Sequence, residues 1–286
     1  MKNNHFTYLL ILSMFLWGGG WSALKILTYE LPMDIIIFWR FFLMSLSFLP
    51  ILYFLKKPIS VNKNSLKYIL SSSVLNIAFM VSSFLGIKYG TAGAAGVIIT
   101  TLSPVMTFLL VALIFRKRLH NIQYLGLAIG VLGGFIMLQM HDLSLFFNGA
   151  NSYFLLCALI WAGVTLLSQH SHKHIHPIHY SFFISLIATI VSFIYSYNSD
   201  LLRVFEQGNE FWISLVYLAV LGQTVATTIF FMASGKLGSE KTSSFMFLVP
   251  LFALLCAWLV LDEAIEIHII LGGTVSMLAI FFINKK

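Results

Sequence analysis

Long apolar runs follow one another along almost the entire chain, with only short polar connections between them. Hydropathy resolves ten such runs in the 286 residues, at approximately 6–28, 34–55, 66–88, 92–115, 121–140, 151–170, 177–197, 210–233, 239–261 and 266–284. A bilayer accepts a helix of about 20 apolar residues, because such a helix satisfies all its own backbone hydrogen bonds. The sequence therefore predicts an all-α polytopic membrane protein with ten transmembrane helices.

The composition excludes most soluble functions. Hydrophobic residues make up 59% of the chain and charged residues only 9%, against roughly a quarter charged in an ordinary soluble domain. Too few polar residues remain to cover the outside of a soluble enzyme. The apolar runs also leave no room for a separate catalytic or nucleotide-binding domain. Cys157 and Cys256 both lie in apolar runs, and we expect buried thiols rather than a disulfide.

The basic residues indicate how the helices are oriented. With the N-terminus in the cytoplasm, 13 of the 17 Lys and Arg residues fall in cytoplasmic segments, and only Lys88 and Arg203 fall in outside segments. The cytoplasmic set is Lys2, Lys56, Lys57, Lys63, Lys67, Arg116, Lys117, Arg118, Lys173, Lys236, Lys241, Lys285 and Lys286. An excess of positive charge on the cytoplasmic side is the usual orientation signal of membrane proteins. We therefore expect both termini in the cytoplasm, and the net charge of +7 needs no nucleic-acid partner.

Matching landmarks recur in the two halves of the chain. Trp161 follows Trp17 by 144 residues, and Pro250 follows Pro104 by 146 residues. One repeat would hold five helices, an odd number, so the second copy would cross the membrane in the opposite direction. Inverted repeats of this kind form the framework of many secondary transporters. The predicted repeats are residues 1–144 and 145–286.

The order of several short motifs resembles that of the EamA-type carriers in the drug/metabolite transporter superfamily. The motifs are Trp17-Gly18 with Lys25, Pro32 to Arg40, Ile87 to Ala92, Leu102-Ser103-Pro104, Leu221 to Thr224, Lys236 to Ser239, Leu248-Val249-Pro250 and Leu261-Asp262-Glu263. The resemblance covers almost the whole chain. It implies a multi-pass carrier of the bacterial cytoplasmic (inner) membrane that moves a small metabolite, drug-like or amino-acid-like solute. One departure is Arg116-Lys117-Arg118, where the family often shows Gly-Glu.

Two mid-span prolines are the first candidates for a solute site. Pro104 and Pro250 fall near the midpoints of their runs, where proline breaks the helical ladder and frees a carbonyl four residues earlier. Interrupted helices at matching positions of two repeats point to a transporter's binding site, and Thr100 beside Pro104 is a candidate contact. The alternative is a kink whose freed groups are satisfied by neighbouring helices.

A second candidate is one face of the first run. Trp17, Trp21 and Lys25 recur every four residues and therefore share a helical face. Trp161 and Gln169 occupy the matching positions of the sixth run. A lysine among apolar residues is costly unless it faces a wet cavity or a partner. The alternatives are an ion pair between Lys25 and an outer acid, and ordinary packing for the tryptophans.

Three further polar residues lie inside apolar runs. Arg40 lies about two turns into the second run, Asn76 lies at the middle of the third, and Gln223 is its approximate counterpart in the eighth. With no carboxylate at a span centre, the basic groups would create a positive field that favours an anionic or zwitterionic solute. The alternatives are a salt bridge from Arg40 to an outer acid, and hydrogen bonds between helices for the two amides.

Two other patterns have a structural explanation and a functional one. Histidines alternate along His170–His179, which suits metal chelation but also suits a cytoplasmic loop; we expect no metal. Gly126, Gly130 and Gly134 form a ridge of small residues that lets another helix approach. We expect this ridge to pack within a monomer, with a homodimer as the alternative.

The sequence favours a secondary transporter that works by alternating access, as an exporter or an exchanger. It carries no Walker A loop, so we expect no ATPase, no cofactor and no enzymatic activity. The expected partners are a small-molecule solute and the lipid bilayer. The alternatives are a channel-like or receptor-like membrane protein and, less favoured, an intramembrane enzyme, for which neither His-Glu-x-x-His nor Gly-x-Ser-x-Gly is present.

Overall fold

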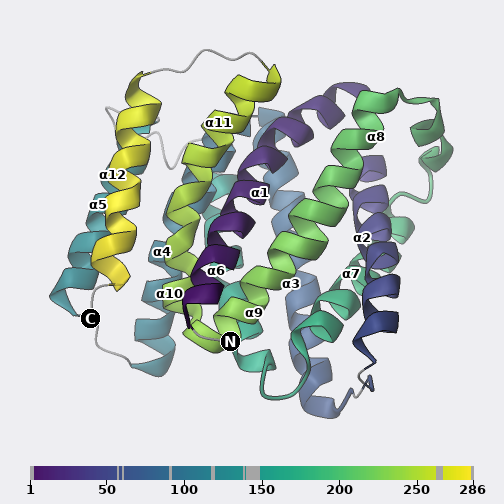
Figure 1. The fold of residues 1–286 in the computed structure, drawn as a ribbon. Helices are drawn as coiled ribbons and strands as arrows, with labels where there is room; N and C mark the ends of the chain where they lie inside the picture. Colours follow the sequence, from purple (N-terminus) through teal and green to yellow (C-terminus); the bar gives the residue numbers. More distant parts are fainter. Residues whose placement is uncertain are drawn as a thin grey trace.

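The fold is a bundle of long helices, which confirms the all-α prediction (Figure 1). The computed structural model describes residues 3–56, 58–59, 61–89, 92–116, 120–137, 139, 149–261 and 267–284, and among these no residue lies in a strand. The first half contains α1 (Asn3–Glu30), α2 (Met33–Leu55), α3 (Lys63–Tyr89), α4 (Ala92–Phe115) and α5 (Asn121–Met137). Both cysteines are free and buried, as expected.

The second half is more often interrupted than the first. Its elements are α6 (Ala150–Ser171), α7 (Pro177–Tyr195), the 3₁₀ helix η2 (Leu201–Glu206), α8 (Asn209–Val216), the π-helix η3 (Tyr217–Thr227), α9 (Thr228–Leu237), α10 (Ser239–Ser244), the 3₁₀ turn η4 (Phe245–Leu248), α11 (Val249–Leu261) and α12 (Ile267–Asn284). The segments α8, η3 and α9 follow one another without a break. The predicted run 239–261 is divided among α10, η4 and α11.

Seven helices among the described residues are long and apolar enough to cross a membrane. They are His5–Glu30, Met33–Leu55, Lys63–Tyr89, Ala94–Phe115, Asn151–Ser171, Pro177–Tyr195 and Asn209–Leu237. Asn121–Met137 and Ile270–Asn284 are shorter apolar helices. The chain is therefore a multi-pass membrane protein.

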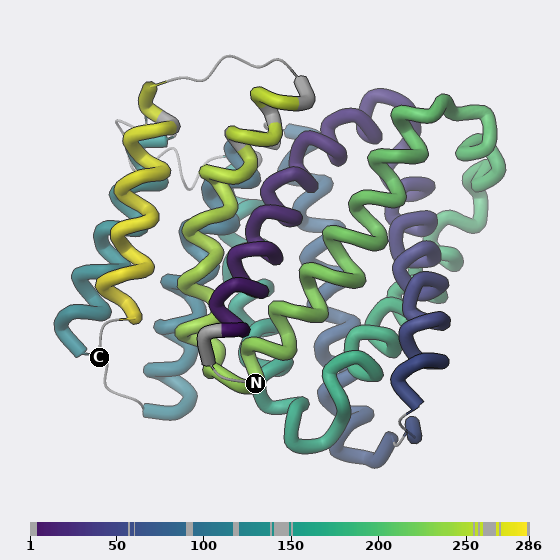
Figure 2. Tube along the Cα trace, viewed as in Figure 1, coloured from purple at the N-terminus to yellow at the C-terminus, as the bar shows by residue number. Residues whose placement is uncertain are grey.

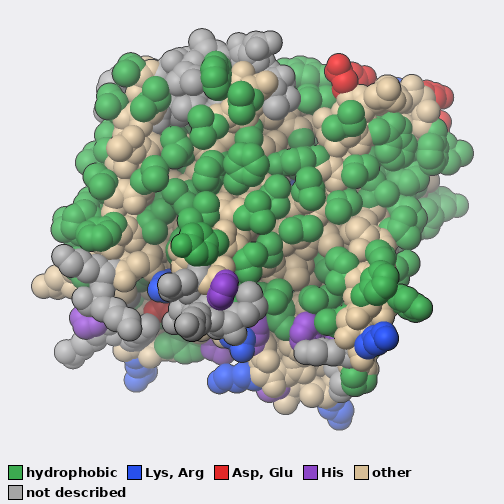
Figure 3. Space-filling model, viewed as in Figure 1, with side chains coloured by type: hydrophobic (Ala, Val, Ile, Leu, Met, Phe, Trp, Pro, Cys, Tyr) green, Lys and Arg blue, Asp and Glu red, His purple; other side chains and the backbone are tan. Residues whose placement is uncertain are grey.

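Charge is segregated between the two ends of the bundle. Lys, Arg and His side chains gather at the end that is lowest in Figure 3, most acidic side chains on this face lie at the other end, and hydrophobic side chains cover the belt between them. The first turn of α1 and the last turn of α12 both lie at the basic end (Figure 1). Of the basic residues used to predict this polarity, Lys2, Lys57, Lys117, Arg118, Lys285 and Lys286 lie outside the described residues.

Helix contacts come in pairs that match between the two halves. The repeat matches α3 with η3, α4 with α11, and α6 with α1. Under this match, the contact of α3 with α6 corresponds to that of η3 with α1, and the contact of α4 with α6 corresponds to that of α11 with α1. The pairs α2–α7 and α5–α12 map onto themselves. Figure 2 shows α5 beside α12 and α1 beside α11. This contact pattern is the one that a two-fold relation between the halves would produce.

The α5–α12 contact brings two backbones together through glycine. A Cβ added to Gly133 would lie 2.6 Å from Gly272 O, and a Cβ added to Gly272 would lie 2.5 Å from Gly133 O. The matching pair is Gly126 and Ala279, where the distance from an added Cβ to the carbonyl oxygen would be 3.1 Å. Only residues without a side chain allow this approach.

The predicted glycine ridge on α5 packs entirely within the chain. Its three members each face a side chain of another element of the same molecule. These contacts are Gly126 with Ile283, Gly130 with Phe247 and Gly134 with Thr101. The ridge therefore already has intramolecular partners.

Candidate functional site

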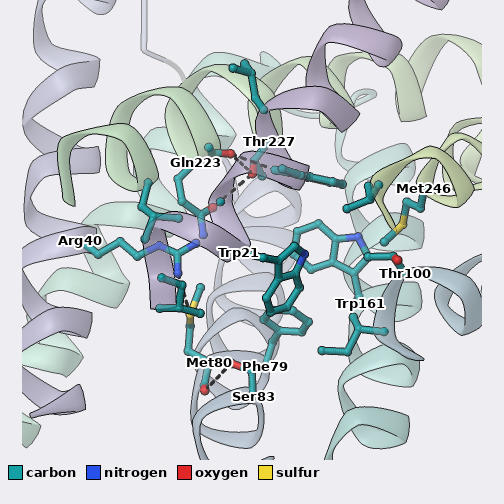
Figure 4. Close-up of a pocket in the computed structure, with 18 of the residues that line it drawn as sticks. Trp21, Arg40, Phe79, Met80, Ser83, Thr100, Trp161, Gln223, Thr227 and Met246 are labelled. Carbon is teal, nitrogen blue, oxygen red and sulfur yellow. Dashed lines mark hydrogen bonds between the residues drawn. The ribbon is translucent and has the colours of Figure 1, made fainter. Parts of the chain in front are cut away.

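A cavity of about 110 Å³ lies where α1 to α4 meet elements of the second half (Figure 4). Its lining is largely apolar, with a few polar side chains. The lining residues are Leu16, Trp17, Gly20, Trp21, Leu24, Arg40, Phe79, Met80, Ser83, Phe84, Ile99, Thr100, Trp161, Leu218, Gly222, Gln223, Thr227, Met246 and Val249. Drug-sized pockets are about 300–1,000 Å³, so this conformation accommodates a small solute only.

The matching tryptophans of the two halves meet beside the cavity. The Trp17 and Trp161 rings pack edge to face with centroids 5.3 Å apart. Trp17 Nε1 donates to Gly222 O at 3.0 Å, which fixes its indole against η3. Trp21 lies against Gly96 of α4, where an added Cβ would be 3.3 Å from the indole ring. The tryptophans therefore form a fixed aromatic wall in the middle of the bundle.

The π-helix η3 supplies the opposite polar groups. Thr224 Oγ1 donates to Ala219 O at 3.1 Å and Thr227 Oγ1 donates to Gly222 O at 3.2 Å, both across five residues. The same Thr227 hydroxyl lies 3.2 Å from Gln223 Oε1. A π-helical stretch widens the turn, and such stretches are frequent at functional sites. Here the wide turn carries Gly222 O, Gln223 and Thr227 to the cavity.

Arg40 is the only cationic side chain among the lining residues. Its Nη1 has a weak contact with Met80 Sδ at 3.9 Å, and its Nε is buried without a hydrogen-bond partner. No described carboxylate forms an ion pair with this guanidinium. Asp34, an outer acid six residues earlier in α2, instead accepts a hydrogen bond from Ser199 Oγ at its carboxylate and one from Ser196 Oγ at its backbone carbonyl. The salt bridge to an outer acid is therefore not found among the described residues.

The structure brings some of the sequence-predicted site residues together and leaves others apart. Those that line the cavity are Trp17, Trp21, Arg40, Thr100, Trp161 and Gln223. Those that do not line it are Lys25, Asn76, Pro104, Gln169 and Pro250. Asn76 is buried and donates through Nδ2 to Ser72 O of its own helix at 2.9 Å.

The two prolines differ in their effect on the backbone. Helix α4 runs through Pro104 without a break, whereas the 3₁₀ turn η4 ends just before Pro250. Hydroxyl groups around Pro104 bond to nearby carbonyls: Ser103 Oγ to Ile99 O at 2.6 Å and Thr107 Oγ1 to Ser103 O at 2.8 Å. Neither bond reaches Thr100 O, the carbonyl that Pro104 leaves without its usual backbone donor. The matching interruption expected in the first half is nevertheless absent from α4.

Three hydrogen bonds join the C-terminal part of α6 and the residue after it to α9 and α10. We call these three hydrogen bonds the α6 seam. They join Ser234 Oγ to Thr165 O, Ser239 N to Gln169 Oε1, and His172 Nε2 to Phe231 O, each at 3.0 Å. Gln169, predicted to contact solute, thus links helices at the basic end of the molecule.

The histidines of the stretch His170–His179 contact different neighbours. His170 stacks on Phe115 and His174 on Tyr68, with centroids 5.0 Å and 5.4 Å apart. Among the described residues, no group of three or more His, Cys, Asp or Glu side chains could hold a metal ion. The stretch runs from the last turn of α6 into the first turn of α7, and its rings contact Phe115 and Tyr68 of the first half.

His172 makes the stability of the α6 seam depend on pH. Burial, together with the charge of Lys236, lowers the pKa of His172 below its ordinary 6.5, against an opposing hydrogen bond to Phe231. The folded state therefore binds a proton less readily than the unfolded chain, and stability falls as the pH drops below about 6.5. When the pH is lowered from neutral to mildly acidic, we expect the melting temperature of His172→Gln to fall less than that of the parent. The exposed His120→Gln is the control, and an equal pH response of all three proteins would contradict this.

Several lining residues carry no signal in the sequence. Phe79, Met80, Leu218 and Met246 are apolar residues within apolar runs, so nothing distinguishes them from lipid-facing positions. The sequence indicates the π-helix only weakly, through Thr224 and Thr227, which follow Ala219 and Gly222 by five residues.

Known proteins of the same architecture are carriers. The model of the EamA-like transporter family matches residues 6–139 and again 149–285. The Bacillus subtilis "Uncharacterized transporter YoaV" is 25% identical over 93% of this chain and 92% of its own length. A Salmonella typhimurium "Probable amino-acid metabolite efflux pump" is 23% identical over 97% of this chain and 93% of its own length.

The fold also matches a solved one. A crystal structure at 14% identity superposes with a TM-score of 0.73 over 98% of this chain and 96% of the other, which shows a common fold. Two successive family matches therefore cover nearly the whole chain, and the resemblance of the sequence motifs is confirmed. The chain belongs to the EamA-like transporter family, and it is a membrane transporter of small solutes.

Proposed function

We propose that the chain is a secondary carrier in which two inverted five-helix repeats, 1–144 and 145–286, expose a central cavity alternately to each side of the membrane. The observation that carries this proposal is the cavity itself, because Trp17 and Trp161 meet beside it from matching positions of the two halves. A site between inverted repeats is the usual arrangement in secondary transporters. The repeat boundary lies outside the described residues.

The proposed topology has ten spans with both termini in the cytoplasm. Residues 239–261 form the ninth span from α10, η4 and α11, and the two shorter apolar helices form the fifth and tenth. Basic side chains gather at the end of the bundle that holds the first turn of α1 and the last turn of α12, and this supports the proposed orientation. The location that we propose is the bacterial cytoplasmic (inner) membrane.

The α6 seam supports a conformation closed toward the cytoplasm. By the repeat offset, Lys25 and Thr28 of α1 correspond to Gln169 and His172. Thr28 Oγ1 bonds within its own helix, to Lys25 O at 2.9 Å, rather than across to another element. In the opposite conformation of the carrier, the end of α1 would bond across to other elements and the end of α6 would not. The carrier then opens toward the cytoplasm by releasing the α6 seam.

The solute is a small metabolite, drug-like or amino-acid-like molecule, and the chain works as an exporter or an exchanger. The efflux-pump names of the Salmonella typhimurium and Escherichia coli relatives favour export. Protons are coupled through intramembrane carboxylates in many carriers, and no cavity-lining residue is acidic. We therefore favour exchange or facilitated diffusion, with a monomer as the working unit.

The test is counterflow in proteoliposomes loaded with unlabelled amino acids, organic acids, amines or small drugs. We expect one solute class to drive saturable uptake of its own labelled form, independent of an imposed pH gradient. A channel would give flux without saturation, and an intramembrane enzyme would release altered solute. Either result, or no flux above protein-free liposomes with any class, would contradict the proposal.

A further inference from the structure

Two residues that line the cavity carry buried hydrogen-bond donors that the chain leaves unpaired. Seven buried side-chain polar atoms among the described residues have no partner, and two of them are nitrogens, Arg40 Nε and Trp161 Nε1. Both nitrogens belong to residues that line the cavity. A buried donor without an acceptor costs about 1–3 kcal/mol, so a site that keeps two of them is built for a ligand that accepts hydrogen bonds.

The neighbouring polar groups strengthen this donor character. The Thr227 hydroxyl has a single hydrogen, which Gly222 O and Gln223 Oε1 share at 3.2 Å each, and the amide NH₂ is the part of Gln223 that we assign to a ligand. Figure 4 shows the Gln223 side chain and the Arg40 guanidinium pointing toward the same part of the cavity, with Trp21 facing them. The Thr100 hydroxyl donates to Gly96 O at 2.6 Å. The Arg40 and Gln223 donors therefore lie at one end of the cavity, and the Trp161 indole lies apart from them (Figure 4).

The charge and shape of the lining restrict the ligand further. No lining residue is acidic, so an ammonium group would find no carboxylate there. A guanidinium fork matches a planar carboxylate with two parallel hydrogen bonds, and a single cation balances a single negative charge. The remaining wall is largely apolar and includes the aromatic rings of Trp21, Phe79 and Trp161.

We propose that the cavity binds an organic monocarboxylate whose charged end lies between Arg40 and Gln223 and whose apolar body lies against Trp21 and Phe79. The Trp161 indole N–H binds a further acceptor on that body. This proposal rests on the proposed carrier function and names its substrate class. It distinguishes a simple carboxylate from a zwitterion, which the sequence left open.

Three probes with the same phenyl body test the charge requirement by calorimetric titration of the purified full chain. Phenylpyruvate has a carboxylate only, phenylalanine has a carboxylate and an ammonium, and phenethylamine has an ammonium only. We expect phenylpyruvate to bind tightest and phenethylamine not to bind. Tighter binding of either ammonium compound, or no phenylpyruvate binding at millimolar concentration, would overturn the proposal.

Variants then assign the binding to the guanidinium. Arg40→Gln should weaken phenylpyruvate binding roughly tenfold to a hundredfold, as expected for a hydrogen bond to a charged group. The phenylpyruvate affinity of Arg40→Lys should lie between those of the parent and Arg40→Gln, because lysine keeps the positive charge but lacks the planar guanidinium. Arg203→Gln is the matched control, since Arg203 is exposed on η2. Unchanged affinity in Arg40→Gln would overturn the proposal.

The outcomes separate this proposal from the carrier function. If proteoliposomes show saturable counterflow of a solute whose affinity is the same in the parent and in Arg40→Gln, the carrier function is supported and the carboxylate site is wrong. If phenylpyruvate binds through Arg40 but no solute class shows counterflow, the site stands and the carrier fails.

Discussion

Trp161→Ala should lower the free energy of unfolding by about 3–5 kcal/mol and abolish transport, because removal of a buried tryptophan leaves a large void. Trp161 is 6% exposed. Its ring contacts those of Trp17 and Phe79, with centroids 5.3 Å and 5.2 Å apart, and lies 6.0 Å from Phe230. The substitution thus removes the group that joins both halves at the cavity wall. Thermal unfolding in detergent and counterflow in proteoliposomes measure the two effects.

Trp258→Ala is the matched control, since it removes the same side chain from an outward-facing position that is 48% exposed. Substitutions at exposed positions usually change stability by about 0.5 kcal/mol or less. Trp161→Phe retains most of the ring and should keep most of the stability. If Trp161→Ala and Trp258→Ala were equally stable, the aromatic cluster would not support the cavity.

Gly272→Ala should separate α5 from α12 and lower the free energy of unfolding by about 1–3 kcal/mol, as expected for overpacking. The added Cβ would lie 2.5 Å from Gly133 O and 2.8 Å from Met137 N, both backbone atoms that cannot rotate away. Gly133→Ala strains the same contact from the other helix. The double variant should therefore cost less than the two single variants together.

The neighbouring Gly273→Ala is the control in the same helix. Its Cβ would meet only the Leu251 side chain, with the rotatable Cδ1 at 3.3 Å and Cβ at an ordinary contact distance of 3.7 Å. Alanine is also a better helix former than glycine by about 1 kcal/mol, so this variant should be neutral or slightly stabilising. Equal destabilisation by Gly272→Ala and Gly273→Ala would show that the close α5–α12 approach is not what the glycine provides.

The fold was largely predictable from the sequence because lipid imposes a simple rule. Each apolar run must become a helix, and the observed bounds of α2, Met33–Leu55, and α7, Pro177–Tyr195, lie within two residues of the predicted runs. The offset also identified Trp17 and Trp161 as matching positions, but the contact between their rings, with centroids 5.3 Å apart, was not predicted from it.

The site was only partly predictable, because hydropathy says how deep a residue lies but not which way it faces. Arg40 and Gln223 were found because a polar group inside an apolar run is costly. Asn76 gave the same signal, yet its amide bonds to its own helix. Phe79 gave none, because an aromatic ring facing the cavity and one facing lipid look alike in a sequence. The widening at Gly222 depends on hydrogen bonds across five residues, which no apolar pattern encodes.

The central claim is that solute crosses by release of the α6 seam, and one cross-link tests it. In a Cys157→Ala, Cys256→Ala background, Gln169→Cys and Ser239→Cys place one thiol on each side of the contact in which Ser239 N now donates to Gln169 Oε1 at 3.0 Å. Closing them with a short reversible thiol cross-linker should abolish counterflow, leave external solute binding intact, and restore flux on reduction. Undiminished counterflow with the seam fully cross-linked would contradict the claim.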